Sequence, residues 1–350
     1  MLSACPAAVV IGTGSHLPSR VVRNTDAPLS LLETSDEWIR SRTGIETRRW
    51  AEPGESTGDL AVRAGQRALR SAGVERVDLV VVSTTTPDHH SPATAPWVAA
   101  QLGLGTVPAF DIAAACSGFV YAVAAGDAWI RAGAAETVLL IGAETLSTIT
   151  DMSDRGTAVV FADGAGAVVL RRGTADEAGA VLATQLGSDG TQKDLAVIAA
   201  GGSRRPDAGP DARPDAGQAA VQAAGHDARC LRMQGPQMFA HATRRMTEVS
   251  RSLLGAVGWE AEDVEAFIGH QANQRILDKV ADLVGIRPPG RLGNIREVGN
   301  TSSASIPLVM DGVVREKAVG AGARTLLTAF GGGAVWGAVA MTWPDIQPVF

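Results

Sequence analysis

The stretch Pro108–Val120 reads P-A-F-D-I-A-A-A-C-S-G-F-V and contains one of the three cysteines of the chain. Its apolar residues 110–114 predict a short strand that runs into Cys116, and the pattern beyond Cys116 predicts a helix. Free backbone N–H groups and the helix dipole at a helix start favour an anion, which lowers the pKa of a thiol there and makes it a nucleophile. A cysteine can equally be a small apolar residue in a helix cap. This stretch alone supports both interpretations.

The second half of the chain repeats features of the first. The segment 71–83, S-A-G-V-E-R-V-D-L-V-V-V-S, resembles 256–270, A-V-G-W-E-A-E-D-V-E-A-F-I-G-H, and each is a helix end followed by acidic residues and a buried strand. The segment 135–144, A-E-T-V-L-L-I-G-A-E, resembles 323–332, A-R-T-L-L-T-A-F-G-G. Both pairs lie about 187 residues apart, which indicates an internal duplication of half the chain.

Two polar residues complete a candidate site. The spacing of the duplication aligns Cys116 with Ser303, which lies in G-N-T-S-S-A-S close to Asn300. His270 follows a buried strand in G-H-Q-A-N-Q-R-I, at the carboxyl end of the sheet, where α/β proteins place their sites. Either residue alone is more often structural than catalytic. Cys116, His270 and Asn300 together, each at a strand end of a duplicated unit, indicate catalysis.

Seven motifs carry a resemblance to a known family. They are T-S-D-E-W-I-x-x-R-T-G-I, A-F-D-I-A-A-A-C-S-G-F, D-R-G-T, F-A-D-G-A-G-A, H-Q-A-N-x-R-I, G-N-T-S-S-A-S-I-P and F-G-G-G-x-x-W-G. On these motifs the chain resembles the 3-oxoacyl-[acyl carrier protein] synthase III (ketoacyl synthase III) family, over its full length outside residues 201–229. The resemblance implies a thiolase-like α/β fold, in which two related βαβαβαββ halves (residues 1–175 and 176–350) form a five-layer α-β-α-β-α sandwich, usually as a homodimer.

The resemblance also implies a ping-pong reaction. Cys116 attacks an acyl-CoA thioester, CoA leaves, and a malonyl thioester on acyl carrier protein binds and loses carbon dioxide to give a carbanion that attacks the acyl-cysteine. A Cys116 thiolate is expected, since a helix dipole and an imidazole both favour it. His270 and Asn300 are neutral donors that can hold the thioester oxygen as it becomes an enolate. The backbone N–H groups of Cys116 and Gly332 would form the oxyanion hole of the acyl-transfer steps.

The matched motifs also imply a binding site for CoA. Trp38 and Arg155 would sandwich the adenine, with Arg42 near the phosphates. The alternative for Trp38 is an ordinary anchor on the capped amphipathic helix predicted over residues 34–42. The pantetheine tunnel or its mouth would be lined by Gly235, Phe239, Asn273 and Arg275.

Ser91 departs from the family pattern at the acyl pocket. In members that prime with acetyl-CoA, the residue before Pro92 tends to be a bulky aromatic that closes the acyl pocket of the partner subunit. Because serine leaves room there, the sequence predicts acceptance of an acyl group that is longer or bulkier than acetyl.

The docking face for the carrier protein is a second departure. Ala240, Asp282 and Leu283 stand where basic residues are expected after Phe239 and Arg275. The basic side chains that remain to attract an acidic carrier protein are Arg244, Arg245, Arg275 and Lys279.

The composition also argues against several classes of protein and site. A hydrophobic content of 45% with 40 glycines is typical of a well-buried globular protein, and a net charge of −6 argues against nucleic-acid binding. The three cysteines have no paired spacing, so we expect neither a disulfide framework nor a zinc site. The N-terminus lacks the basic region of a signal peptide and no apolar run is long enough to span a bilayer, so we expect a cytoplasmic protein without membrane association. No flavin, nicotinamide or metal motif is found, and acyl-CoA and malonyl-carrier protein are expected as substrates rather than cofactors.

Two local predictions complete the analysis. Residues 157–161 and 165–170 predict a pair of strands around Ala162-Asp163-Gly164. The P-D-A repeats within 201–229 predict a mobile surface loop.

Two alternatives to a condensing enzyme stay open. An acyltransferase of the same fold could pass the acyl group to an alcohol or an amine, but Asn300 favours condensation because it supports enolate formation. A non-catalytic subunit or binding module would usually lose the cysteine, and the intact A-A-A-C-S-G argues against it.

Overall fold

The computed structural model describes residues 6–203 and 228–348. The first of its two main sheets has the strand order β1-β7-β6-β4-β5. Strand β4 is parallel to β5 and β6, whereas β7 is antiparallel to β6 and β1. The strands are β1 (Pro6–His16), β4 (Leu79–Ser83), β5 (Ala109–Ile112), β6 (Thr137–Thr145) and β7 (Asp163–Thr174).

The second main sheet repeats this arrangement. Its order is β11-β12-β13-β8, with β11 and β12 parallel and the other pairs antiparallel. An isolated parallel bridge between Phe267 and Arg291 lies beside β11, where the first sheet has β5 beside β4. The strands are β8 (Val181–Ser188), β11 (Ala266–Gly269), β12 (Arg324–Gly331) and β13 (Val335–Thr342).

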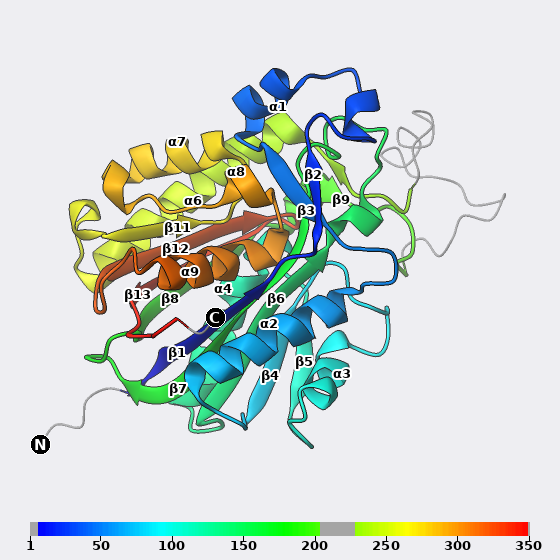
Figure 1. The fold of residues 1–350 in the computed structure, drawn as a ribbon. Coiled ribbons are helices and arrows are strands. Elements are labelled where there is room, and N and C mark those ends of the chain that lie inside the picture. The colour runs from blue at the N-terminus through cyan, green and yellow to red at the C-terminus, as the bar shows by residue number, and fades with distance from the viewer. Residues whose placement is uncertain (1–5, 204–227, 349–350) are drawn as a thin grey trace, which may run out of the picture.

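Helices cover both sheets and fill the space between them (Figure 1). Helices α2 (Thr57–Ala72) and α3 (Thr94–Gln101) pack on the outer face of the first sheet, and α6 (Gly235–Val257) and α7 (Gln274–Val284) on that of the second. Helices α4 (Gly118–Arg131) and α9 (Ser305–Glu316) lie between the sheets in one apolar core. These layers are the five-layer sandwich that the family resemblance implied.

The middle layer explains the long apolar run after Cys116. A helix between two sheets needs apolar side chains on every side. Phe119, Val120 and Val123 of α4 are all buried in the core shared by both sheets, and each such side chain contributes about 1.5–3 kcal/mol when it leaves water. Burial of α4 therefore fixes the position of the turn that carries Cys116.

Shorter elements complete the fold. Helix α1 begins with the predicted cap, since the Ser35 side chain accepts a hydrogen bond from the Trp38 N–H, and it ends at the left-handed Gly44. The other elements are α1 (Asp36–Thr43), α8 (Ile295–Val298), β2 (Arg20–Arg23), β3 (Thr47–Trp50), β9 (Ala196–Val197) and β10 (Arg232–Met233). Short 3₁₀ segments cover Leu29–Leu31, Ala115–Ser117, Leu146–Ile149, Gly190–Leu195, Ala261–Asp263, Pro288–Gly290 and Ser302–Ala304.

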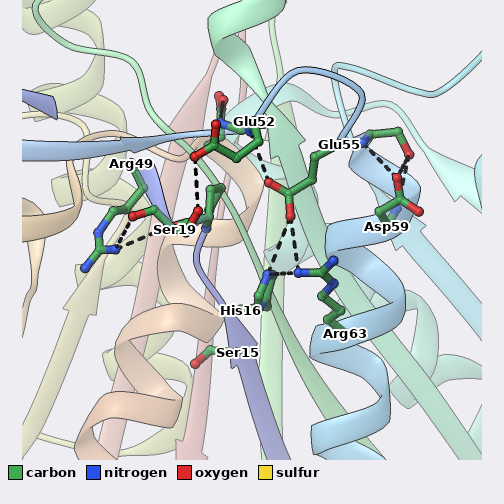
Figure 2. Close-up of polar contacts among 12 residues, drawn as sticks. Ser15, His16, Ser19, Arg49, Glu52, Glu55, Asp59 and Arg63 are labelled. Carbon is green, nitrogen blue, oxygen red and sulfur yellow. Dashed lines mark hydrogen bonds and ion pairs between the residues drawn. The ribbon is translucent and has the colours of Figure 1, made fainter. Parts of the chain in front are cut away.

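A polar cluster joins β1 to the start of α2 (Figure 2). The Glu55 carboxylate lies 3.8 Å from His16 Nε2 and 3.4 Å from Arg63 Nη1, and it accepts a hydrogen bond from the Glu52 N–H. Burial lowers the pKa of His16, and the charges of Arg63 and Arg67 lower it further. His16 is thus a neutral ring that can accept a hydrogen bond from Arg63.

Two local predictions have different outcomes. The strand predicted over 157–161 is wrong: residues 157–160 form consecutive turns, and Phe161 makes only an isolated bridge to Asn300. The N–H groups of Val160 and Phe161 both bond the Thr157 carbonyl. The Thr157 hydroxyl bonds the Asp154 side chain, which favours the turn over an extended chain. Most of the loop predicted over 201–229 lies outside the described residues. The division of the chain at residue 175 falls between β7 and β8 and stays a prediction.

No helix of the described ranges has the length and apolar character needed to cross a membrane. Within the same ranges, no group of three or more His, Cys, Asp or Glu side chains is arranged to hold a metal ion.

Candidate active site

One cavity brings the three predicted catalytic residues together. It has a volume of about 280 Å³ and is lined by Cys116 from the first half of the chain and by His270 and Asn300 from the second. Its wall is mostly apolar. Other lining residues are Thr85, Ala115, Leu146, Phe161, Ala196, Val197, Ile198, Leu231, Met233, Met238, Ala242, Ala272, Ile276, Ser302, Phe330, Gly331, Gly332 and Gly333.

Cys116 lies in a tight turn at the start of the central helix α4. The 3₁₀ turn Ala115–Ser117 carries it, and Ala115 has the left-handed φ of +44° that non-glycine residues rarely adopt. A β-carbon on Gly331 would lie only 2.7 Å from the Cys116 backbone nitrogen, so glycine is needed for β12 to approach this closely. The Ser117 hydroxyl donates to the Val335 carbonyl at 3.0 Å. The second half of the chain thus holds the turn in place.

The Cys116 thiol is protonated in this environment. Burial raises its pKa to about 11, and the negative charge of Glu144 acts in the same direction. Hydrogen bonds with the Ser302 side chain and with the backbone N–H of Cys116 itself lower the pKa, but by less. The prediction of a resting thiolate is therefore wrong, because loss of water outweighs the helix terminus.

His270 is a buried and neutral imidazole. It follows β11, is 2% exposed, and its backbone N–H bonds the Thr328 carbonyl of β12. Burial lowers its pKa to about 3, against a smaller opposite effect of a hydrogen bond with the Ser302 backbone. Its Nδ1 lies 2.7 Å from the Ser305 hydroxyl, which also accepts a hydrogen bond from the Gln271 N–H. The neutral state agrees with the role expected from the sequence.

Asn300 is oriented by its own loop. Its N–H bonds the Val160 carbonyl and its carbonyl accepts from the Ala162 N–H, so the segment 160–162 holds its backbone at both polar groups. Its Oδ1 accepts a hydrogen bond from the Ser302 N–H at 2.9 Å. Because a backbone N–H can only donate, the oxygen must face Ser302, and the NH₂ group is left to serve the cavity that Asn300 lines.

Gly332 also lines the cavity, next to the close approach of Gly331 to Cys116. A β-carbon at Gly332 would lie 2.9 Å from the Ala196 side chain, so β9 can pack against this loop only because the residue is glycine. The pairing of its N–H with that of Cys116 in an oxyanion hole stays a prediction.

Comparison with known proteins identifies the family of the chain. The family model of 3-oxoacyl-[acyl-carrier-protein (ACP)] synthase III matches residues 110–190, and its C-terminal counterpart matches residues 254–343. The β-ketoacyl-[acyl-carrier-protein] synthase III 5 of Streptomyces coelicolor is 52% identical over 97% of this chain and 98% of its own. The chain belongs to the 3-oxoacyl-[acyl-carrier-protein] synthase III family.

Two solved structures support the assignment of fold. The 3-oxoacyl-(acyl carrier protein) synthase III of Pseudomonas aeruginosa matches with a TM-score of 0.88 and 45% identity over 98% of this chain and 100% of its own. The priming β-ketosynthase of the R1128 polyketide pathway matches with a TM-score of 0.86 and 31% identity over 100% and 99% of the two chains. The predicted family, fold class and enzyme class, a condensing acyltransferase, are confirmed.

The residues that the synthase III motifs assign to CoA form a connected group. The guanidinium carbons of Arg42 and Arg155 lie 5.1 and 5.3 Å from the centre of the Trp38 ring. Asn273 donates to the Arg42 carbonyl at 2.9 Å, and its Oδ1 accepts from the Arg275 N–H at the start of α7. Arg275 in turn lies over Phe239 of α6, at 5.7 Å from the ring centre.

Gly235 does not join this group of predicted residues. It is exposed at the first position of α6, and a β-carbon there would meet nothing within 4 Å. The same helix instead turns Met238 and Ala242 into the cavity, one helical turn apart and in line with the buried Met246. Sequence reasoning missed these two residues, although their spacing of four is the signal that reveals them.

Ser91 does not line the cavity of its own chain. It is exposed and borders a second hollow of about 890 Å³. Thr85 and Ile198 line both spaces, so the hollow adjoins the cavity of Cys116. The contribution of Ser91 to the acyl pocket of a neighbouring subunit stays a prediction.

One of the predicted docking residues also makes contacts within the chain. The Arg245 guanidinium lies 4.5 Å from the centre of the Trp336 ring, and it is 3.1 Å from Glu248 and 3.9 Å from Asp189. Its charge is therefore partly balanced within the chain, and its part in docking stays a prediction. Arg244, Arg275 and Lys279 are exposed.

Proposed function

We propose that this chain catalyses the decarboxylative condensation of an acyl-CoA starter with malonyl-[acyl carrier protein], through an acyl-cysteine at Cys116. The product is a 3-oxoacyl thioester that begins a fatty-acid or polyketide chain. The supporting observation is the cavity in which a thiol, a neutral imidazole and a free amide NH₂ meet from the two halves of the chain. Relatives named β-ketoacyl-[acyl-carrier-protein] synthase III support the same reaction.

Acyl transfer is the first half-reaction. The Cys116 sulfur attacks the thioester carbonyl, the carbonyl oxygen becomes negative, and the bond to the CoA sulfur breaks as the carbonyl re-forms. The backbone N–H groups of Cys116 and Gly332 stabilise the negative oxygen, and both residues line the cavity. Gly331 keeps this turn and β12 in close contact, which fixes the donors before the charge develops.

Condensation is the second half-reaction. The malonyl carboxylate leaves as carbon dioxide, and the thioester oxygen takes up the enolate charge between the Asn300 NH₂ group and the His270 ring. In this proposal the Ser305 hydroxyl, which accepts from the Gln271 N–H, donates its own hydrogen to His270 Nδ1, and Nε2 then carries the donor proton. An apolar wall favours loss of the carboxylate charge. The enolate carbon then attacks the acyl-cysteine.

CoA binds at the group formed by Trp38, Arg42 and Arg155. The guanidinium groups of Arg42 and Arg155 already lie close to the Trp38 ring, so adenine enters by displacing Arg155, which is exposed and donates to the Glu33 carbonyl. The displaced side chain then stacks on the free face of adenine. Both arginines place positive charge where the phosphates of CoA are negative.

A homodimer completes the acyl pocket in this proposal. Within residues 6–203 and 228–348, strand β5 pairs on one side only, with β4. It leaves a sheet edge that a second copy can pair with antiparallel across a two-fold axis. Ser91 of one protomer then borders the acyl pocket of its partner and leaves room for starters larger than acetyl. The acidic carrier protein docks at the exposed Arg244, Arg275 and Lys279 in the cytoplasm, and the reaction needs no cofactor.

Release of carbon dioxide tests the proposal. The purified chain is mixed with acyl-CoA and with malonyl-carrier protein labelled in its free carboxyl group, and label lost as gas is compared with 3-oxoacyl product. We expect one carbon dioxide per product, and we expect Asn300→Ala to form acyl-Cys116 without releasing label. Transfer of the acyl group to an alcohol or amine without loss of carbon dioxide would overturn condensation in favour of the alternative acyltransferase.

A further inference from the structure

Strand β3 carries a guanidinium group that is fully buried. Arg48 is 0% exposed, although arginine is almost never fully buried unless it is paired with a carboxylate. Burial lowers its pKa to about 10, so the group is still a cation at neutral pH. Among the described residues, its Nε and Nη1 atoms have no hydrogen-bond partner and no carboxylate forms an ion pair with it. A buried cation without a carboxylate disfavours the folded state, so stability alone does not explain this arginine.

The Nη2 atom of Arg48 joins two segments that are far apart in the chain. It carries two hydrogens, and it donates to the Val159 carbonyl at 2.9 Å and to Asn24 Oδ1 at 2.7 Å. Asn24 is itself fixed, because its NH₂ group donates to the Ile45 carbonyl and to Asp36, both at 2.8 Å. The contact with Asn24 therefore orients the guanidinium group, and the guanidinium group fixes the position of the Val159 carbonyl.

The segment that Arg48 holds is also the segment that holds Asn300. Val160 and Ala162, which follow Val159, make the two backbone hydrogen bonds of Asn300. A shift of the Val159 carbonyl would therefore move the backbone of Asn300. Since the Asn300 NH₂ group serves the cavity, such a shift would also move this donor.

Strand β3 contacts the same region in two other places. A β-carbon on Gly299, whose φ is +78°, would lie 3.0 Å from the Arg48 β-carbon, so the residue before Asn300 packs directly on β3. The Trp50 indole N–H donates to the Phe161 carbonyl at 3.2 Å. Strand β3 thus supports both the Asn300 loop and the segment that is hydrogen-bonded to it.

We propose that Arg48 is a positioning residue for Asn300 in the condensation step of the proposed function, on which this inference rests. The guanidinium group fixes residues 159–162, and these residues fix the backbone from which the Asn300 NH₂ group reaches the enolate oxygen. Arg48 does not line the cavity, so it acts through Asn300 and not on the substrate. Cys116 and Gly332, which serve acyl transfer, lie on other segments, so the first half-reaction does not depend on Arg48.

Two single-turnover measurements separate the half-reactions. Acylation of Cys116 by acyl-CoA is followed by intact-protein mass spectrometry. The acylated enzyme is then mixed with malonyl-carrier protein labelled in its free carboxyl group, and release of labelled carbon dioxide is timed. Arg48→Met keeps a long unbranched side chain but removes the donors and the charge. We expect acylation within about threefold of wild type and carbon dioxide release at least about tenfold slower, because a small displacement of a catalytic donor is costly.

Matched variants separate positioning from a general loss of structure. Arg48→Lys keeps a cation that can donate to Val159, so we expect carbon dioxide release only about threefold below wild type, with acylation unchanged. Arg49→Met removes the next arginine of β3, which instead donates to the Pro18 carbonyl (Figure 2), and both rates should equal those of wild type. Melting temperatures are recorded for each variant. Should Arg48→Met fail to fold, Arg48→Lys carries the test through its selective effect on carbon dioxide release.

Hydrogen exchange gives a second readout that needs no substrate. The Ala162 N–H is bonded to the Asn300 carbonyl at 2.9 Å, so its exchange with solvent reports on the contact between the two segments. In Arg48→Met we expect exchange of the peptide that contains residues 159–162 to become at least about threefold faster. In Arg49→Met it should stay as in wild type.

The inference is overturned if Arg48→Met slows both half-reactions by the same factor, which a general scaffold role predicts. It is also overturned if carbon dioxide release slows by less than about tenfold in Arg48→Met or, where only Arg48→Lys folds, does not slow at all. Failure of the proposed function would look different, because wild type itself would then not be acylated or would release no carbon dioxide.

Discussion

Lowering the pH from 7 to 5 should reduce the free energy of unfolding through His270. This ring has a pKa of about 3 in the folded chain because burial disfavours its charged form. In the unfolded chain its pKa returns to about 6.5. A lowered folded-state pKa gives stability that is fully present above the unfolded value and is lost as the pH falls toward the folded value. Acid therefore favours the unfolded state, which alone binds the proton.

The size of the effect follows from the two pKa values. At pH 5 the unfolded ring is almost fully protonated and the folded ring is not. The free energy of unfolding therefore falls over the interval of about 1.5 pH units between 6.5 and 5. At about 1.36 kcal/mol per pH unit, the loss is about 2 kcal/mol. Glu144 acts in the opposite direction, because its raised pKa means that acid removes an unfavourable buried charge. Comparison with a His270 variant cancels that contribution, since Glu144 is present in both proteins.

Urea unfolding of wild type and His270→Asn at pH 7 and pH 5, at one protein concentration, measures the difference. Asparagine keeps a polar atom near Ser305 but does not titrate. We expect wild type to lose about 2 kcal/mol more than the variant between the two pH values. Equal losses, within about 0.5 kcal/mol, would refute the claim that His270 is buried in its neutral form.

Three further predictions concern the site. Gly331→Ala would place a β-carbon 2.7 Å from the Cys116 nitrogen, so the acylation rate should fall at least about tenfold in a rapid-quench assay, with KM for acyl-CoA little changed; an unchanged rate would contradict the packing argument. Arg155→Ala removes the contact with Trp38 and should raise KM for acyl-CoA about tenfold. Turnover of an acyl-N-acetylcysteamine thioester, which lacks the nucleotide, should stay as in wild type. An equal loss of activity with both substrates would exclude a contact between Arg155 and the nucleotide. Ser305→Ala removes the partner of His270 Nδ1, so carbon dioxide release should slow by about 10–100-fold while acylation of Cys116 proceeds normally; loss of both steps would place Ser305 in the general scaffold instead.

Much of the site could be predicted because its residues belong to short motifs at strand ends. Cys116 lies in the turn Ala115–Ser117. Asn300 lies two residues before the equivalent turn, Ser302–Ala304, and His270 follows β11. The pattern of apolar residues around each of them indicates at which end of a strand the residue lies. Parallel strands bring such ends to one edge of a sheet, so their meeting in one cavity follows from the topology.

Properties that depend on distant packing could not be predicted. The Cys116 pKa is set by burial between both halves and by Glu144, none of which a helix start reveals. Arg245 is engaged by Trp336, which lies far along the chain. The turn at 157–161 has apolar residues typical of a strand, yet local hydrogen bonds to Thr157 and the contact with Asn300 decide its conformation.

The most direct test of the account is intact-protein mass spectrometry after brief mixing with a panel of acyl-CoAs. We predict a single acyl adduct on wild type, its absence in Cys116→Ala, and its retention in Cys230→Ala, which removes another cysteine of the described chain. The adduct that forms fastest identifies the starter, and we expect one larger than acetyl to be accepted. No adduct with any acyl-CoA, or an adduct that survives in Cys116→Ala, would contradict the assignment of Cys116 as the acyl carrier.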